Sequence, residues 1–84
     1  IDKVNDDYLK AEVKGNIGKV LTQLHKFSEA YPYLIESYDY FKSLPAKDKM
    51  SEGCLNIANY FLKTRNYESA LYYINKSIQF SQEI

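Results

Sequence analysis

Residues 56–71 read NIANYFLKTRNYESAL, and residues 16–31 read NIGKVLTQLHKFSEAY. The two stretches are 40 residues apart, and small, apolar and aromatic residues recur in them in the same order. The matched pairs, extended toward the end of the chain, are Asn16 and Asn56, Ile17 and Ile57, Gly18 and Ala58, Leu21 and Phe61, Phe27 and Tyr67, Ala30 and Ala70, Tyr33 and Tyr73, and Ser37 and Ser77. Such a repeat is typical of a structural unit that stacks on copies of itself. We therefore expect a binding surface and not a catalytic fold.

The composition limits the class of protein. The chain has 84 residues and a hydrophobic content of 45%, which suits one small globular domain over residues 1–84. Lys plus Arg and Asp plus Glu number 11 each, so no excess positive charge is present to hold a nucleic-acid backbone. We expect no direct contact with nucleic acid. No apolar run approaches the roughly 18 residues of a membrane-spanning helix, so we expect no contact with a membrane either.

Cysteine usage and the first residues bear on the location of the protein. Cys54 is the single cysteine, so an internal disulfide cannot form, which fits a reducing compartment. No basic segment followed by an apolar stretch opens the sequence, so we expect no signal peptide and a cytoplasmic location. Because the chain begins with Ile1 and stops directly after an apolar run, we also expect it to be a piece of a longer protein.

Hydrophobic periodicity predicts an all-α fold of four helices. We expect helices over residues 4–24, 28–42, 46–64 and 67–82. The turns inside the first and second pairs are short, so each pair should form an antiparallel hairpin. The two hairpins would then stack as a short α-solenoid, with one repeat at about residues 12–43 and the other at about residues 52–83.

Capping and helix-breaking residues set the expected helix ends. Ser28 is the expected N-cap of the second helix and Asn66 that of the fourth. Pro32 fits the second helix only if this helix begins no earlier than about residue 28, since proline removes a backbone donor and crowds the preceding turn. Pro45 disfavours helical backbone at Leu44, so the two hairpins should separate there.

Small residues at matched positions predict where the helices touch. Two helix axes approach closely where the side chains between them are small. Gly18 would meet Ala30 in the first hairpin, and Ala58 would meet Ala70 in the second. The inner face of the second helices would continue through Leu34, Tyr38, Ile74 and Ile78. One hairpin cannot bury such a face alone, so stacking is required.

This order of residues resembles the tetratricopeptide repeat. Residues 56–71 are the stronger copy, with a small Ala58, an aromatic Tyr67 at the turn and then Ala70, and residues 16–30 are the weaker one. The resemblance covers about residues 12–82 and implies a helical solenoid that binds peptides or proteins. A spacing of 40 residues exceeds the usual period of about 34. It is similar to the longer repeats of kinesin light chains, spindle-orientation adaptors and Gram-positive peptide-pheromone receptors.

Several positions depart from the family pattern. Where the family has Gly between paired helices, this chain has His25 and Arg65. Either these residues adopt a left-handed backbone conformation, at a cost of about 1 kcal/mol each, or the turns have a different shape. Cys54 replaces the early aromatic residue of the second copy, and Lys42 and Gln82 replace the closing proline.

The resemblance also implies a binding face. In the family, the first helices of successive repeats line a concave surface on which extended peptides lie. The side chains that would face a peptide are Asn16, Lys19, Thr22, Gln23, Asn56, Asn59 and Lys63, beside Gly15, Leu55 and Leu62. A carboxamide both donates and accepts hydrogen bonds, which suits a peptide backbone, and the lysines suit a ligand carboxylate. The alternative is that these polar side chains are only solvated.

The other chemistry-bearing residues have structural explanations. Cys54 fits a small buried apolar group, and His25 fits a surface turn. Glu12 and Glu52 share a repeat position but lie on separate hairpins, so they do not suggest an acid/base pair. Most of the nine tyrosines would pack between helices. With no phosphate loop and no metal-ligand spacing, we expect no catalytic residue, no metal and no cofactor.

Two functions from different classes remain, and an enzyme is a third that no residue pattern favours. The first is a non-catalytic module that binds a peptide or protein, as part of a larger regulatory protein such as a peptide-pheromone-responsive transcriptional regulator. Residues 66–78 resemble that class, which implies a helix-turn-helix domain elsewhere in the longer protein. The alternative is a structural self-association or capping repeat of a scaffold or adaptor, in which exposed Tyr40, Phe80 and Ile84 pair two copies as a homodimer.

Overall fold

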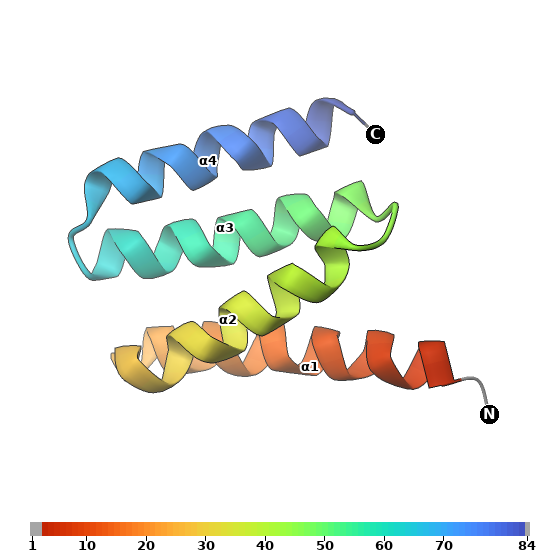
Figure 1. The fold of residues 1–84 in the computed structure, drawn as a ribbon. Coiled ribbons are helices and arrows are strands. Elements are labelled where there is room, and N and C mark those ends of the chain that lie inside the picture. Colours follow the sequence, from red (N-terminus) through yellow and green to blue (C-terminus); the bar gives the residue numbers. More distant parts are fainter. Residues whose placement is uncertain (1–2, 84) are drawn as a thin grey trace.

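Four helices follow one another with short connections (Figure 1). The computed structural model describes residues 3–83. The helices are α1 (Lys3–Gln23), α2 (Phe27–Lys42), α3 (Lys47–Lys63) and α4 (Tyr67–Gln82). α1 packs against α2, and α3 packs against α4, so the predicted all-α fold with two hairpins is confirmed. No strand occurs in the described part of the chain.

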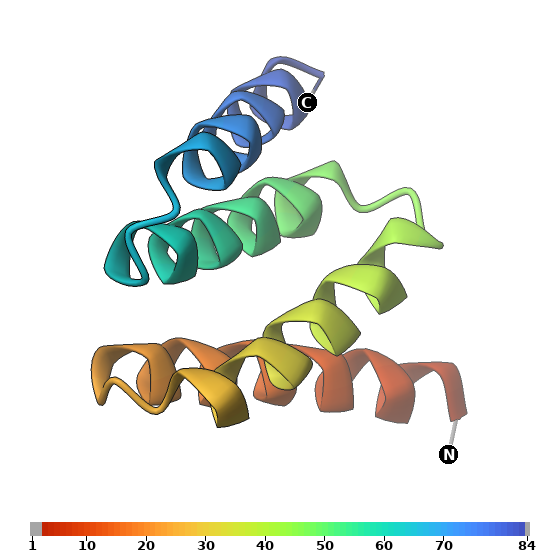
Figure 2. The same ribbon diagram turned by 60° about the vertical axis from the view of Figure 1, so that its left-hand side comes forward.

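α3 lies between the first hairpin and α4. It contacts α4 on one side and both α2 and α1 on the other. In both views the two hairpins form successive layers, with α1 and α2 in the lower layer and α3 and α4 in the upper one (Figures 1 and 2). α1 and α3 run in the same direction, because both hairpins begin at the same end of the molecule (Figure 1).

An apolar cluster joins the four helices at the end that carries the α2–α3 connection. Its buried members are Ala11, Phe41 and Met50. Half-buried side chains pack around them, namely Tyr8, Tyr38, Tyr40, Leu44, Ala46 and Phe80. The expected exposure of Tyr40 and Phe80 is therefore wrong, because both lie against this cluster within the chain. Ile84, the third residue of that expectation, lies outside the described residues.

A chain of aromatic rings links the helices at the other end. The Tyr60 ring of α3 lies between two rings of α2, with centroids 5.9 Å from Phe27 and 5.1 Å from Tyr31. Next to it, Phe61 lies 6.1 Å from Tyr31 and stacks 5.8 Å from Tyr73 of α4. Aromatic pairs at these distances each add about 0.5–1.5 kcal/mol beyond their burial. The rings therefore tie α2, α3 and α4 together, in agreement with the packing role predicted for the tyrosines.

Three serines connect α3 and α4. The Ser77 hydroxyl donates a hydrogen bond to the backbone carbonyl of Ser51 at 3.0 Å. Ser51 Oγ lies 2.9 Å from Ser77 Oγ and 2.8 Å from Ser81 Oγ. Ser51 and Ser77 are buried, so their hydroxyls need these partners to offset the loss of water. The small side chains let the two backbones come close.

The two hairpin turns have the same geometry. His25 has φ 61° and Arg65 has φ 63°, so both adopt the left-handed conformation left open by the sequence. Lys26 N–H donates to Leu21 O at 2.9 Å, and Asn66 N–H donates to Phe61 O at 2.8 Å. These six-residue hydrogen bonds define the Schellman helix ending, in which glycine is the usual left-handed residue.

The beginnings of the second helices differ from each other. The Asn66 side chain accepts a hydrogen bond from Ser69 N–H at 3.3 Å, so the predicted N-cap of α4 is confirmed. The prediction of Ser28 as the N-cap of α2 was wrong. α2 begins at Phe27, and Lys26 occupies the N-cap position without a side-chain hydrogen bond. Pro32 consequently lies inside α2, beyond the first turn.

The first hairpin closes over a glycine. A Cβ placed on Gly18 would lie 2.7 Å from Leu34 Cγ and 3.1 Å from Leu34 N. Gly18 thus faces Leu34, one turn beyond the predicted partner Ala30, which is itself fully buried. Neither helix could approach this closely with a larger residue here. The packing explains why α1 carries a glycine despite its low helix propensity.

We expect Arg65→Gly to raise the free energy of unfolding by about 1 kcal/mol, because glycine removes the left-handed strain at this position. Chemical denaturation followed by far-UV circular dichroism measures the change. Thr64→Gly is the matched control: Thr64 has φ −89° and its hydroxyl donates to Phe61 O at 3.2 Å, so this variant should lose stability. An Arg65→Gly variant no more stable than wild type would contradict the strain argument.

We expect Gly18→Ala to lower the free energy of unfolding by about 1–2 kcal/mol, because the new methyl group overlaps Leu34. This loss should exceed the gain of about 1 kcal/mol in helix propensity. The control is Gly15→Ala, whose Cβ would lie 2.9 Å from the Ser37 hydroxyl, a group that can rotate away. Denaturant unfolding of both variants should place Gly15→Ala near wild type. Equal stabilities for the two variants would disprove the close approach at Gly18.

Candidate functional site

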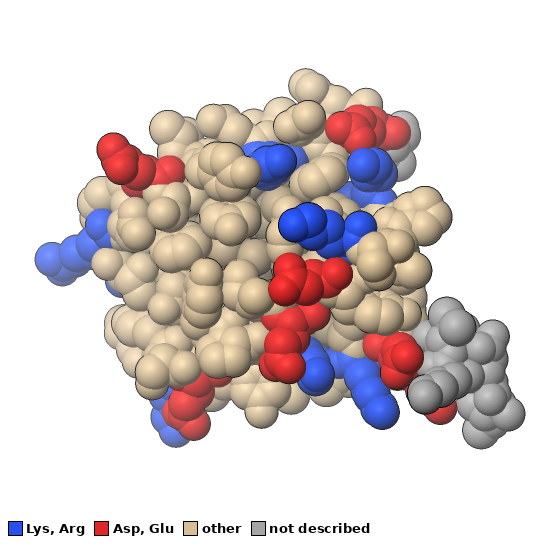
Figure 3. Space-filling model, viewed as in Figure 1, with Lys and Arg blue, Asp and Glu red and all other residues tan. Residues whose placement is uncertain are grey.

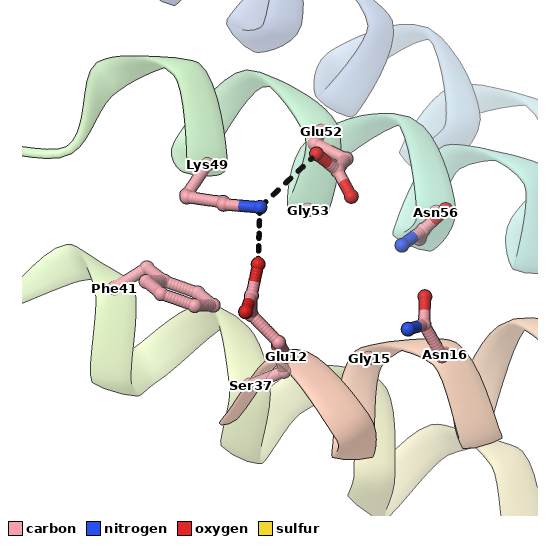
Figure 4. A pocket seen from close by; sticks show the side chains of 9 residues that line it. All are labelled: Glu12, Gly15, Asn16, Ser37, Phe41, Lys49, Glu52, Gly53 and Asn56. Atoms are coloured by element: carbon pink, nitrogen blue, oxygen red, sulfur yellow. Dashed lines mark hydrogen bonds and ion pairs between the residues drawn. The ribbon is translucent and has the colours of Figure 1, made fainter. Parts of the chain in front are cut away.

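A small pocket opens where α1 and α3 face each other (Figure 4). Its volume is about 40 Å³. The lining residues are Glu12, Gly15 and Asn16 from α1, Ser37 and Phe41 from α2, and Lys49, Glu52, Gly53 and Asn56 from α3. Pockets that enclose whole small molecules typically measure about 300–1,000 Å³. This pocket therefore suits one group of a ligand that lies across the surface.

Two asparagines from equivalent repeat positions meet at the pocket. Asn16 on α1 and Asn56 on α3 point into the gap between the helices from opposite sides (Figure 4). Asn16 is exposed and Asn56 is half-buried. Neither carboxamide makes a hydrogen bond to a residue in the described range 3–83. Their donors and acceptors are therefore available to a ligand.

An ion pair across the two hairpins closes one end of the pocket. Lys49 Nζ on α3 lies 2.6 Å from Glu12 Oε2 on α1 and 3.8 Å from Glu52 Oε2 on α3 (Figure 4). The hydrogen bond to Glu12 raises the pKa of the Lys49 ammonium, and the nearby Glu52 charge adds to this effect. Partial burial of Lys49 opposes the rise. Two carboxylates around one ammonium leave this end of the pocket with a net negative charge.

Beyond the pocket, α1 and α3 each carry a lysine, and we call the surface along the two helices from Glu12 and Glu52 to these lysines the groove. Lys19 and Lys63 are both exposed, and both lie C-terminal to the asparagines of their own helix. Because α1 and α3 run in the same direction, Glu12 and Glu52 lie toward one end of the groove and the lysines toward the other. Glu12 and Lys19 are about 10 Å apart along the axis of α1, at about 1.5 Å per residue. The two ends of the groove therefore carry opposite charges.

The other residues predicted to face a peptide differ in their exposure to solvent. Gln23 is exposed, and Asn59 is half-buried on α3. Leu55 and Leu62 are exposed on α3, whereas Gly15 is buried against Ser37. Thr22 does not face the groove: it is buried, and its hydroxyl donates to Gly18 O at 2.8 Å within α1. A threonine bonded back to its own helix is satisfied without a ligand.

Sequence reasoning did not select the charged end of the pocket. Lys49, Gly53 and Phe41 line it, and none of them was predicted to face a ligand. A signal was nevertheless present, because Glu12 and Glu52 occupy one repeat position and Lys49 lies one helical turn before Glu52. The sequence pattern does not give the distance between α1 and α3. That distance is short enough for Lys49 to reach Glu12 on the other helix.

Charges of both signs are interspersed on the molecular surface. On the face drawn in Figure 3, neither Lys and Arg nor Asp and Glu form a broad continuous patch. The formal net charge of the chain is zero. Binding at this surface would consequently depend on local groups and apolar contact, since no long-range field of one sign is present to attract a charged partner.

The remaining chemical groups are accounted for by packing. Cys54 is fully buried. Burial raises the pKa of the Cys54 thiol, and the neighbouring Tyr38 hydroxyl and Lys76 charge only reduce that rise. Within the described residues, no group of three His, Cys, Asp or Glu side chains could hold a metal ion. No helix in this part of the chain has the length and apolar character needed to cross a bilayer.

Comparisons with protein-family models, with curated proteins and with solved structures each gave no match to this chain. The likeness to the tetratricopeptide repeat therefore depends on the internal repeat of residues 16–31 and 56–71 and on the two hairpins.

We expect the Cys54 thiol of the folded protein to react with a disulfide reagent only as fast as the structure opens. The thiol is inaccessible, and its raised pKa lowers the fraction of reactive thiolate. The release of the chromophore from Ellman's reagent measures the rate, and the same chain in denaturant provides the reference. Equal rates in the two states would contradict the burial of Cys54.

Proposed function

We propose that this chain is a non-catalytic module of the tetratricopeptide type that binds an extended peptide or protein segment in the groove between α1 and α3. The chain would belong to a larger regulatory protein, such as a peptide-responsive transcriptional regulator, whose DNA-binding domain lies outside this segment. The two hairpins, the repeat spacing and the geometry of the pocket support this proposal.

The observation that carries the proposal is the pair of carboxamides from Asn16 and Asn56. They come from the same position of two repeats and point into one gap from opposite sides (Figure 4). An extended peptide exposes an N–H and a carbonyl at each residue, and a carboxamide can satisfy both kinds of group without adding charge. Two carboxamides on opposite walls could therefore bond one peptide group of a ligand that lies across the opening of the pocket.

The charges along the groove favour one orientation of the ligand. The negative end beside Glu12 and Glu52 suits a cationic group, such as a peptide amino terminus or a lysine side chain. Lys19 and Lys63 suit a carboxylate. A ligand with its amino end toward the two glutamates and an acidic end toward the lysines would match both. All four side chains are at least partly exposed, so these contacts would favour an orientation more than they would add affinity.

Apolar side chains at the edge of the groove would supply the remaining contact. Leu55 and Leu62 are exposed on α3 and do not contribute to the buried core. A pocket of about 40 Å³ admits only one small group, so most of a peptide would lie on the open surface beside it. Burial of apolar area contributes about 25 cal/mol per Å², which makes these leucines suitable contacts for apolar ligand side chains.

We expect Asn16→Ala and Asn56→Ala each to weaken peptide binding by about threefold to tenfold, which corresponds to one lost hydrogen bond of roughly 0.5–1.5 kcal/mol. The probe is a peptide selected from a display library of short unstructured sequences and labelled for fluorescence polarisation. Both side chains are at least partly exposed and unbonded within the described chain, so thermal unfolding should stay close to that of wild type.

Asn75→Ala is the matched control, since Asn75 is an exposed asparagine of α4 away from the groove. Its affinity for the selected peptide should equal that of wild type. If the two groove variants bind as tightly as Asn75→Ala, the groove is not the binding site. A library that yields no peptide bound by the wild-type chain would count against the function itself.

A further inference from the structure

α1 presents an apolar stripe on the side away from α2. The stripe consists of Leu9, Val13, Ile17, Val20 and Leu24, and all five side chains are exposed. Their spacing of three and four residues places them on one face of the helix. By contrast, most of the buried residues of α1 are small, and they include Ala11, Gly15, Gly18 and Thr22; Tyr8, which packs on Phe41, is the large residue on that side. The helix thus turns much of its apolar surface outward.

The equivalent side of α3 is covered by the first hairpin. A shift of 40 residues takes the α1 stripe to Lys49, Gly53, Ile57, Tyr60 and Thr64. Of these, Lys49 pairs with Glu12, Gly53 lies against Tyr38, and Tyr60 packs on Phe27 and Tyr31. The same residue type shows the contrast directly, because Ile57 is 0% exposed and Ile17 is 37% exposed. Among the described residues, no helix covers the α1 stripe as the first hairpin covers the equivalent side of α3.

α4 presents the matching surface at the other end of the molecule. The α2 side chains in contact with α3 include Phe27, Tyr31 and Tyr38. Their equivalents on α4 are Tyr67, Leu71 and Ile78, which we call the α4 face. These three side chains are 63%, 60% and 52% exposed. Ile78 was predicted to lie on an inner face; it is exposed because, within residues 3–83, no helix other than α3 packs against α4.

The sizes of the equivalent side chains are complementary. At the junction between α2 and α3, a Cβ on Gly53 would lie 3.2 Å from the Tyr38 ring, so a large residue on α2 meets the smallest residue on α3. The equivalent pair between an α4 face and an α1 stripe is Ile78 and Val13. Ile78 is smaller than its equivalent Tyr38, and Val13 is larger than its equivalent Gly53. The two changes offset each other, so the new pair would occupy a similar volume.

We propose that the α4 face of one copy of this chain packs on the α1 stripe of a second copy and repeats, between molecules, the junction that α2 and α3 form within one. The contact would be mainly apolar, because Leu9 stands where Lys49 makes its ion pair. The occupant is a second copy because its Tyr67, Leu71 and Ile78 are large apolar or aromatic residues at the α4 positions equivalent to Phe27, Tyr31 and Tyr38, which contact α3 in this chain. This inference is independent of ligand binding between α1 and α3.

The contact joins two different surfaces, so each added copy leaves one α1 stripe and one α4 face free. Such head-to-tail contacts extend without limit unless the rotation closes a ring. Sedimentation equilibrium of wild type should accordingly give a weight-average mass that rises with concentration beyond twice the monomer mass. A mass that stays at the monomer value over the whole concentration series would overturn the proposal.

Two single variants test which surfaces are in contact. Ile17→Glu places a charge on the α1 stripe, and Leu71→Glu places one on the α4 face. Each variant alone should be monomeric, because each lacks one of the two surfaces. An equimolar mixture should form a dimer and nothing larger, since Ile17→Glu retains an intact α4 face and Leu71→Glu an intact α1 stripe. Leu55→Glu, a charge on an equally exposed leucine of α3, should associate as wild type does.

The same measurements contain the outcomes that oppose the proposal. A mixture that stays monomeric would show that the two faces do not meet. A Leu71→Glu variant that dimerises alone would show that α1 stripes pair with each other. Far-UV circular dichroism checks that the variants are folded, and Val20→Glu with Tyr67→Glu replaces the pair if either loses helix. Peptide binding is also measured on the Ile17→Glu monomer. This measurement tests the proposed function without stacking, so a failure of one proposal is distinguished from a failure of the other.

Discussion

α3 must be covered on two sides at the same time, and the rest of the arrangement depends on this requirement. Cys54, Ile57 and Ala58 are buried on one broad face of this helix, and that face meets both the first hairpin and α4. Hydroxyls of α4 reach it from one side, and rings of α2 reach it from the other. The layer that the two hairpins share therefore adds burial of apolar and aromatic side chains that neither hairpin provides alone.

The groove follows from how α3 meets the first hairpin. α3 packs more extensively on α2 than on α1, so the side toward α1 remains open between the apolar cluster at one end and the rings at the other. Polar side chains at this opening keep access to water. Lys49 and Glu12 bridge it where the helices come close, and the two asparagines face each other where they do not. The way in which α3 packs on the first hairpin therefore also produces the candidate binding surface.

Periodicity and turn length were sufficient to predict the helices, because local spacing determines which residues share a face. The repeat also indicates where α2 begins, because Lys26 is equivalent to Asn66, the predicted N-cap of α4. Each of the two residues ends a Schellman turn and directly precedes a helix. The prediction of Ser28 as the N-cap of α2 considered only its side chain and overlooked the equivalence of Lys26 and Asn66. Residue spacing does not show that the Thr22 hydroxyl bonds its own helix, and it does not give the distance between hairpins that lets Lys49 reach Glu12.

The serines between α3 and α4 have an effect beyond close spacing. Methyl groups in contact can slide past one another, whereas a hydroxyl bonded to a carbonyl or to another hydroxyl has a preferred direction. Ser51, Ser77 and Ser81 therefore restrain the rotation of α4 about its own long axis. These hydrogen bonds therefore help to set the direction in which Tyr67, Leu71 and Ile78 face the solvent.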